Sequence, residues 1–200
     1  MPITNGYCTL NEVKAALRLS DAVDDTLIEN SIEGASRRID GYCGRFFYQT
    51  TSTQIKFFAS DSYRLPVPDI STTSGLVVAT DDDGDGTFET TWTLNTDYVV
   101  EPLDAVLQSR PYRTITAVGG KTFPLFYIPQ EAGVRITALW GWGAVPDDVR
   151  EACVLLSMRQ FARYNAALGV MAFGDMAVSV RSVDPDVRDL LSPYRLIGIA

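Results

Sequence analysis

The sequence contains no histidine and only three cysteines, Cys8, Cys43 and Cys153. Histidine is the commonest proton carrier near neutral pH and the commonest ligand of transition metals, so its absence removes the most frequent catalytic and metal chemistry. The cysteines lie far apart and form no CxxC pair, which argues against a zinc site or a disulfide framework. We expect three small buried thiols in a protein made in a reducing cytoplasm.

Sequence motifs of nucleophilic catalysis and of phosphate binding are also missing. There is no G-x-S-x-G, no GxxxxGK and no GxGxxG after a strand. Without histidine, the serines lack their usual activating base. These absences predict a protein that is not an enzyme. Acidic proteins always offer pairs of carboxylates, so an enzyme that uses carboxylates alone stays open as an alternative.

Basic clusters and long apolar runs are lacking as well. The chain has 17 Lys and Arg against 25 Asp and Glu, a net charge of −8, and its arginines are scattered. Proteins that grip nucleic acid present a basic patch, so we predict no tight DNA binding, although an acidic surface would let DNA pass without sticking. No segment approaches the roughly 20 apolar residues of a membrane helix, and the first residues do not resemble a signal peptide. We therefore expect a soluble protein with no membrane partner.

Helical periodicity is present at both ends of the chain. The T-L-N-E sequence predicts a capping box, in which Thr9 and Glu12 begin a helix that continues to Leu19. A second amphipathic helix is predicted from about Asp25 to Tyr42, with apolar residues at steps of three and four. Those apolar residues are Ile28, Ile32, Ala35, Ile39 and Tyr42.

The longest predicted helix follows Pro146 and continues to Ala167. Its apolar residues form two separate stripes, one of Val149, Ala152, Cys153 and Leu156, the other of Val154, Met158 and Phe161. A surface helix of a monomer needs only one apolar stripe. We therefore predict that the second face is covered by another subunit.

Between these helices, from Arg45 to Gly141, the apolar period changes to two. This pattern, with frequent Gly and Pro turns, predicts an antiparallel sheet, sandwich or small barrel. The predicted strands are Gln54–Phe58, Tyr63–Val67, Leu76–Thr80, Thr87–Leu94, Tyr98–Glu101, Thr114–Val118, Pro124–Ile128 and Val134–Trp140. A further strand is predicted at Ala177–Val183, followed by a short helix capped by Asp184.

The predicted fold class is α+β. A small helical bundle, made of the two N-terminal helices and the long helix, is interrupted by an antiparallel β module and followed by a C-terminal arm. The predicted boundaries are 1–45 and 141–168 for the helical core, 46–140 for the β module, and 169–200 for the arm.

One acidic turn resembles the first half of an EF-hand calcium loop. Asp81, Asp83 and Asp85 occupy every second position around Gly84. Closely spaced carboxylates of this kind suit a hard cation. However, the twelfth position of the loop is Trp92 instead of a carboxylate, and the flanking residues are strand-like. The preferred interpretation is a hairpin turn built from Asp and Gly. No cofactor is predicted, but a calcium-dependent β binding module using the acidic hairpin 81–89, with these three aspartates as its candidate ligands, stays open as the alternative function.

Three segments share a pattern of residues with one family. The first is T-L-x-E-V-K-x-x-L-R at Thr9–Arg18, followed by an acidic turn, an amphipathic helix and Y-x-G-R at Tyr42–Arg45. The second is G-x-G, Val-Pro and a long helix, beginning at Gly141. The third is D-P-D-V-R-x-L-L-x-P-Y-R at Asp184–Arg195. Together they resemble tailed-phage head–tail connector (adaptor) proteins, in the longer form that carries an inserted β module, as in siphophages and gene-transfer agents.

The resemblance implies a structural virion protein located at the head–tail interface and synthesised in a bacterial cytoplasm. Such connectors form a ring, of about twelve subunits, below the portal protein. The ring extends the channel for double-stranded DNA and offers a docking surface to a tail-side connector or tail terminator.

Two sets of contact residues are predicted on this basis. The expected contacts between subunits are Val154, Met158, Phe161, Ile28 and Ile32. The C-terminal arm, from Gly174 to Ala200, is expected to reach away from its own chain to a neighbour or to the portal. Its expected contact residues are Asp184, Arg188, Leu191, Tyr194, Arg195, Leu196 and Ile197.

Overall fold

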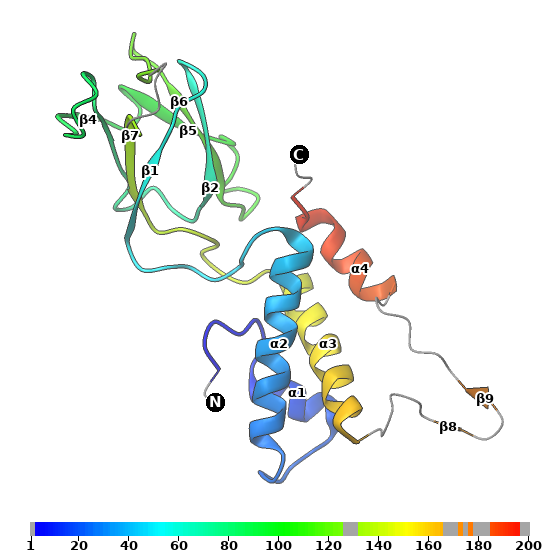
Figure 1. The fold of residues 1–200 in the computed structure, drawn as a ribbon. Coiled ribbons are helices and arrows are strands. Elements are labelled where there is room, and N and C mark those ends of the chain that lie inside the picture. The colour runs from blue at the N-terminus through cyan, green and yellow to red at the C-terminus, as the bar shows by residue number, and fades with distance from the viewer. Residues whose placement is uncertain (1–2, 126–131, 166–171, 174–175, 178–184, 197–200) are drawn as a thin grey trace. The chain divides into compact units, whose positions relative to one another are not determined.

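The computed structural model describes residues 3–125, 132–165, 172–173, 176–177 and 185–196. The chain divides into two compact units, which we describe separately. The helical unit is formed by Met1–Phe47 and Val145–Ala200, and the β unit by Tyr48–Ala144. The β unit is thus inserted between the two parts of the helical unit (Figure 1). This architecture confirms the predicted α+β fold.

The first helix, α1 (Leu10–Leu17), begins with the predicted capping box. The Glu12 backbone N–H donates to Thr9 Oγ1 over 3.3 Å, and the Thr9 backbone N–H donates to the Glu12 carboxylate over 2.7 Å. Each side chain therefore satisfies a backbone group that the helix leaves without a partner. The helix ends at Arg18, whose φ of 57° is left-handed.

The helical unit is built around the packing of α2 (Asp25–Cys43) against α3 (Asp147–Asn165). The buried face of α2 carries the predicted apolar residues except Tyr42, which is half-buried. Helix α3 buries its first predicted stripe except Leu156, together with Phe161 of the second stripe. The two helices approach closely at Gly34, where a Cβ atom would lie 2.7 Å from the Gln160 side chain. The buried residues are Ile28, Ile32, Ala35 and Ile39 of α2 and Val149, Ala152, Cys153 and Phe161 of α3.

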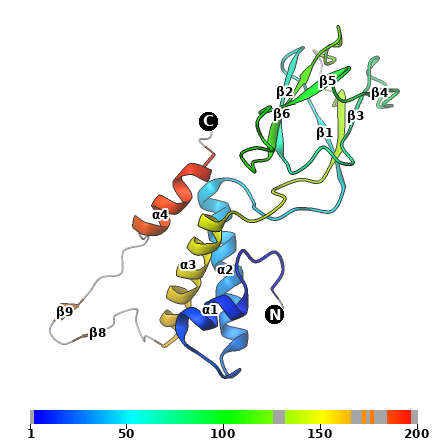
Figure 2. The same ribbon diagram turned by 180° about the vertical axis from the view of Figure 1, so that it is seen from behind.

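The described end of the chain folds back onto this helical unit. Helix α4 (Pro185–Leu191) packs against α3 and buries Val187 and Leu191, and the 3-10 turn η2 (Ser192–Tyr194) follows it (Figure 2). The backbone N–H of Leu196 donates to the carbonyl of Cys43 at the end of α2, over 2.8 Å. The prediction that the C-terminal arm reaches away from its own chain is therefore wrong for residues 185–196. The predicted strand Ala177–Val183 falls almost wholly outside the described residues.

A two-stranded ladder that the sequence did not predict joins β8 (Ala172–Phe173) to β9 (Met176–Ala177).

Two antiparallel sheets form the β unit. The first has the strand order β1 (Thr53–Phe57), β7 (Val134–Ala138), β3 (Val77–Thr80), β4 (Thr90–Trp92), and the second has the order β2 (Arg64–Ile70), β6 (Tyr112–Ala117), β5 (Tyr98–Glu101). Burial alternates along several of these strands, as the period of two predicts. The largest buried side chain is Trp140, whose Nε1–H donates to the carbonyl of Thr53 over 2.8 Å.

Two predicted strands differ from the structure. The segment Thr87–Leu94 forms a strand over Thr90–Trp92, and Leu94 adds an isolated bridge to Tyr98. The described part of Pro124–Ile128, residues 124–125, is not a strand. In the portion of the chain that is described, no helix is both long and apolar enough to cross a membrane.

Candidate functional site

The residues predicted to form subunit contacts lie mostly inside the helical unit. Ile28 and Ile32 are 1% and 0% exposed, and Phe161 is buried as well. Their apolar character is explained by packing within one chain, which replaces the subunit contact predicted for them. Val154 and Met158 are half-buried, and their role as subunit contacts stays a prediction.

The C-terminal residues predicted to contact a neighbour or the portal are largely used within the chain. Leu191 is buried. Tyr194 donates its hydroxyl to Asp148 at the start of α3 over 3.0 Å, and the Arg195 guanidinium lies 5.5 Å from the ring centroid of Tyr42. Of that predicted set, Arg188 and Arg195 are exposed, Leu196 is half-buried, and Asp184 and Ile197 lie outside the described residues. The sequence pattern of residues 184–195 correctly predicts a helix, α4, but this helix packs on α3 of its own chain.

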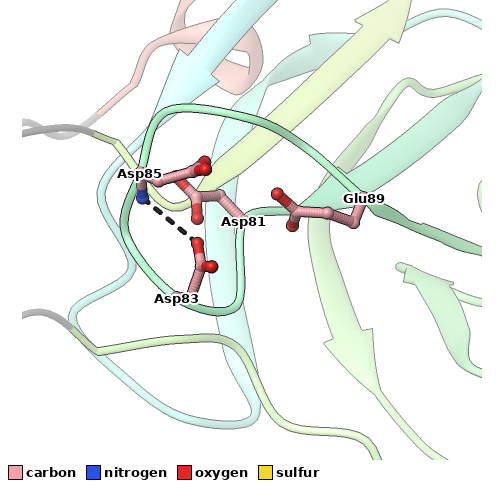
Figure 3. Close-up of side chains that lie close together, drawn as sticks. All are labelled: Asp81, Asp83, Asp85 and Glu89. Carbon is pink, nitrogen blue, oxygen red and sulfur yellow. Dashed lines mark hydrogen bonds between the residues drawn. The ribbon is translucent and has the colours of Figure 1, made fainter.

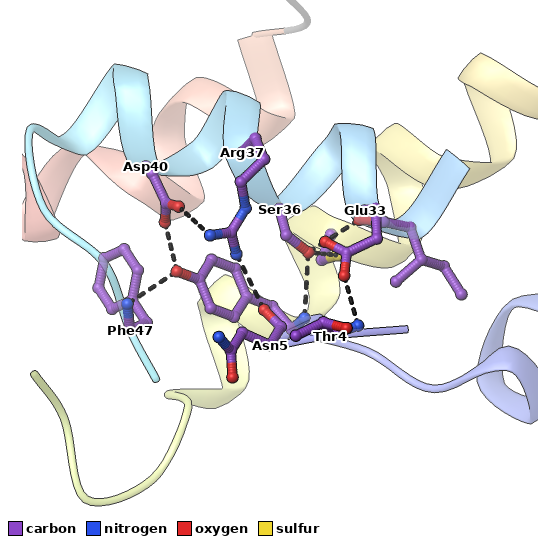
Figure 4. A network of polar contacts seen from close by, with 10 residues as sticks. Thr4, Asn5, Glu33, Ser36, Arg37, Asp40 and Phe47 are labelled. Carbon is purple, nitrogen blue, oxygen red and sulfur yellow. Dashed lines mark hydrogen bonds and ion pairs between the residues drawn. The ribbon is translucent and has the colours of Figure 1, made fainter. Parts of the chain in front are cut away.

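A polar network that sequence reasoning missed ties the N-terminal segment to α2 (Figure 4). The Tyr7 hydroxyl donates to the Asp40 carboxylate and accepts the Phe47 N–H over 2.8 Å. Arg37 pairs with Asp40 over 3.1 Å and donates to the Asn5 carbonyl over 2.9 Å. Residues far apart in the sequence carry this network, so no local pattern announces it.

Burial governs the ionisation of this network. Desolvation raises the pKa of Tyr7, and its hydrogen bond to Asp40 raises it further, so the phenol keeps its proton. Desolvation also raises the pKa of Asp40, against the opposing effects of Tyr7 and Arg37. The network therefore holds the N-terminal segment against α2.

Replacing Tyr7 by phenylalanine should lower the free energy of unfolding by about 1–3 kcal/mol, because the buried Phe47 N–H loses its acceptor. Urea unfolding followed by circular dichroism would measure this loss. The matched control is Tyr164→Phe, which removes an exposed hydroxyl in the same unit. Equal stability of the two variants would contradict the role given to Tyr7.

The acidic turn brings the three predicted aspartates together and adds Glu89, which sequence reasoning missed (Figure 3). One ligand atom from each of the four carboxylates lies within 4.8 Å of the others. Asp81 is buried, whereas Asp83, Asp85 and Glu89 are exposed. The arrangement is compatible with a hard cation held by oxygen ligands.

The same turn is also explained by its backbone hydrogen bonds. The Asp81 carboxylate accepts the N–H groups of Gly84 and Gly86 over 2.7 and 2.8 Å. Desolvation would raise the pKa of Asp81, but these backbone donors outweigh it and the pKa is lowered. Asp81 is thus an ionised group that shapes the turn, and both of its oxygens already have donors.

The β unit exposes an apolar turn between β5 and β6. Sequence reasoning also missed this surface. Leu103, Val106 and Leu107 are 82%, 79% and 88% exposed, and Ala105 between them is buried. The spacing of i, i+3 and i+4 is the one that places side chains on a single face of a helical turn. We call Leu103–Leu107 the apolar turn.

Backbone hydrogen bonds hold the apolar turn in place. The Ala105 N–H donates to the Pro102 carbonyl over 3.1 Å, and the Arg110 N–H donates to the Ala105 carbonyl over 2.9 Å. The three large side chains are therefore presented to solvent by an ordered segment. Exposed apolar groups that cluster in this way mark interaction surfaces.

Comparison with known proteins identifies the class to which this architecture is similar. Residues 7–72, which include α1, α2, β1 and β2, match the family model of the phage gp6-like head–tail connector proteins. The match covers the first of the three segments on which the predicted resemblance rested, and it confirms that resemblance.

Among solved structures, the whole chain is similar to chains from gene transfer agent (GTA) particles. A chain from the neck of the empty GTA particle, computed with C6 symmetry, gives a TM-score of 0.56 at 19% identity, covering 100% of this chain and 95% of that one. A chain from the virion of the native GTA particle gives 0.56 at 20% identity, with coverage of 100% and 95%. A chain from the neck of the native particle, computed with C12 symmetry, gives 0.54 at 19% identity, with coverage of 100% and 94%. These likenesses concern the fold. No curated protein matches the chain.

Proposed function

We propose that this protein is a head–tail connector that forms a ring at the neck of a tailed-phage-like particle. The observation that carries the proposal is the connector family match over residues 7–72, together with a fold shared along the whole chain with proteins of particle necks. In this role the ring lies below the portal protein, extends the DNA channel and presents a docking surface to a tail-side protein.

The ring proposal is supported by the symmetry of the similar particles, whose necks were computed with C6 and C12 symmetry. A ring of about twelve subunits fits both of these symmetries. Each subunit of a ring must offer two unlike faces to its neighbours, because the contact is head-to-tail.

The β unit exposes two apolar surfaces, the apolar turn after β5 and a pair of aromatic side chains before β2. The apolar turn follows the end of β5, where Glu101 pairs with Thr114. The exposed aromatic side chains of Phe58 and Tyr63 precede β2, whose first residue, Arg64, forms an ion pair with Glu101 at the end of β5. We assign the apolar turn to the contact with a neighbouring copy.

The charge of the chain is compatible with a channel for DNA. A net charge of −8 without a basic cluster disfavours tight phosphate binding, so double-stranded DNA would pass without being held.

Sedimentation with purified portal rings tests the proposed function. We expect the protein to co-sediment with the rings even if it is monomeric alone, because the portal provides a template for assembly. The proposal fails if the full chain remains in the supernatant at saturating concentrations of portal. Assembly of a ring in the absence of portal would support the proposed oligomer, and imaging of the complex with portal would then show where the ring binds.

The alternative function, a calcium-dependent β binding module, is favoured by the four carboxylates of the acidic turn. We expect millimolar calcium to leave the thermal unfolding temperature unchanged, because the Asp81 oxygens already accept two backbone N–H groups. Calorimetric titration and thermal unfolding would measure this directly. A calcium-dependent increase that disappears in Asp83→Asn, but persists in the matched variant Asp104→Asn outside the acidic turn, would establish the alternative.

A further inference from the structure

Two of the three cysteines meet in the core of the helical unit. Cys8 precedes α1, Cys153 lies on α3, and their Sγ atoms are 3.3 Å apart. Both are reduced and buried. A disulfide bond has a length of about 2.05 Å, so the sulfurs would have to approach by roughly 1.3 Å, a distance within reach of side-chain rotation.

Hydroxyl groups surround the thiol pair. Ser36 Oγ lies 3.5 Å from Cys153 Sγ, and Ser157 Oγ lies 3.9 Å from the same atom. These hydroxyls are themselves fixed, because Ser36 donates to the Ile32 carbonyl over 2.8 Å and Ser157 to the Cys153 carbonyl over 2.7 Å. The thiol pair therefore lies beside two fixed hydroxyl groups within the buried core.

These contacts favour a thiolate on Cys153. The hydrogen bond from Cys8 is the largest effect, and together with the hydroxyls it outweighs desolvation and lowers the pKa of Cys153 to about 7. The same hydrogen bond raises the pKa of Cys8. By contrast, desolvation raises the pKa of Cys43 to about 11. Because the thiolate is the reactive form, Cys153 is the one of the three cysteines whose pKa favours nucleophilic attack.

We propose that Cys8 and Cys153 form an oxidation site, at which a two-electron oxidant converts the contacting thiols into an intramolecular disulfide. The geometry that carries this inference is the contact of two buried sulfurs from segments 145 residues apart. The bond would link the N-terminal segment covalently to α3. The inference concerns the helical unit alone and does not depend on the connector function.

With the azo compound diamide as oxidant, the reaction balances in two steps. The Cys153 thiolate adds to one nitrogen of the N=N bond, and the other nitrogen takes up a proton. The Cys8 sulfur then attacks the Cys153 sulfur, the S–N bond breaks, and the Cys8 proton passes to the leaving nitrogen. Two thiols are oxidised to one disulfide, and diamide is reduced to the hydrazine.

The cross-link would stabilise the fold, because it joins residues on either side of α1, α2 and the whole β unit. Closing so long a loop restricts the unfolded chain more than the folded one. Disulfides persist outside reducing compartments. A protein that folds with reduced thiols in a cytoplasm and later leaves the cell would therefore form this disulfide after assembly. This consequence rests on the proposed function, whereas the disulfide itself does not.

Peptide mapping of the full-length protein tests the proposal. The native protein is treated with diamide at neutral pH, then denatured and alkylated, and its peptides are identified by mass. We expect one cross-linked peptide joining Cys8 and Cys153, lighter by two hydrogen atoms than the two reduced peptides, with Cys43 alkylated. We also expect the rate to rise as pH increases through about 7, as the Cys153 thiolate forms. Recovery of Cys8 and Cys153 as alkylated thiols, or a bond that includes Cys43, would overturn the proposal.

Variants separate the site from a general effect of oxidation. Cys43→Ala should keep the cross-link, and Cys153→Ser should lose it. Thermal unfolding of the oxidised wild-type protein should occur at a higher temperature than that of the reduced protein, and dithiothreitol should reverse the difference. Because this comparison uses the wild-type chain, it stays decisive even if Cys153→Ser fails to fold. An unchanged unfolding temperature after complete cross-linking would contradict the stabilising role.

Discussion

Replacing Leu103, Val106 and Leu107 together by serine should abolish assembly on portal rings while leaving the stability of the monomer nearly unchanged. The three side chains are 79–88% exposed, so the folded monomer gains little from them. Burying one leucine or valine side chain contributes about 1.5–3 kcal/mol. Loss of three from one contact should therefore weaken it by at least roughly 100-fold.

Analytical ultracentrifugation with and without portal rings would measure this effect, and urea unfolding would verify the monomer. The matched control is Val23→Ser, which removes an equally exposed side chain (86%) from the helical unit. We expect the control to assemble like the wild-type protein. Assembly of the triple variant at full occupancy would show that the apolar turn is not the contact between copies.

Replacing Ile32 by alanine should lower the free energy of unfolding of the monomer by about 2–5 kcal/mol. Ile32 is 0% exposed on the face of α2 that packs against α3. Removing its outer methyl groups loses their burial and leaves a cavity that the helices only partly fill. Ile32→Val should cost only about 0.5–1.5 kcal/mol, which makes the pair of variants a graded test of packing.

The same measurement decides between the two interpretations of Ile32. If the residue served only as a subunit contact, its replacement would leave the dilute monomer as stable as before. Urea unfolding at a concentration where the protein is monomeric therefore separates core packing from assembly. The control is Leu27→Ala on the same helix, a residue that is 38% exposed.

Local signals in the sequence were enough to predict much of the fold. The capping box of Thr9 and Glu12 is present as predicted, and Pro146 immediately precedes α3. The period of two in Val134–Trp140 corresponds to β7 with its alternating burial. These signals depend on neighbours within a few residues, and such neighbours are visible in the sequence.

Contacts between distant residues could not be predicted in the same way. The sequence shows that α3 has two apolar stripes, but it does not show that α4 from the same chain packs on that helix. It likewise contains Tyr7, Asp40 and Phe47 without any sign that the three meet. The burial of Ile32 and Phe161 follows from such tertiary packing, and this is why the subunit contact predicted for them was wrong.

The candidate interaction surface was missed for a different reason. Leu103, Val106 and Leu107 have the spacing of one helical turn, but a single turn is too short for a periodic signal to stand out. Only the structure shows that Ala105 is buried while its three larger neighbours are exposed. The resemblance to connectors was accessible from sequence because it rests on local segments, the first of which contains α1 and α2 and lies within the family match.

Cryo-electron microscopy of the full-length protein bound to purified portal rings tests the central claim most directly. We predict a closed, rotationally symmetric ring of this protein on the axis of the portal, with an open channel and the apolar turn buried between neighbouring copies. Portal rings that carry no density for this protein, or single copies bound without contact to one another, would contradict the connector function.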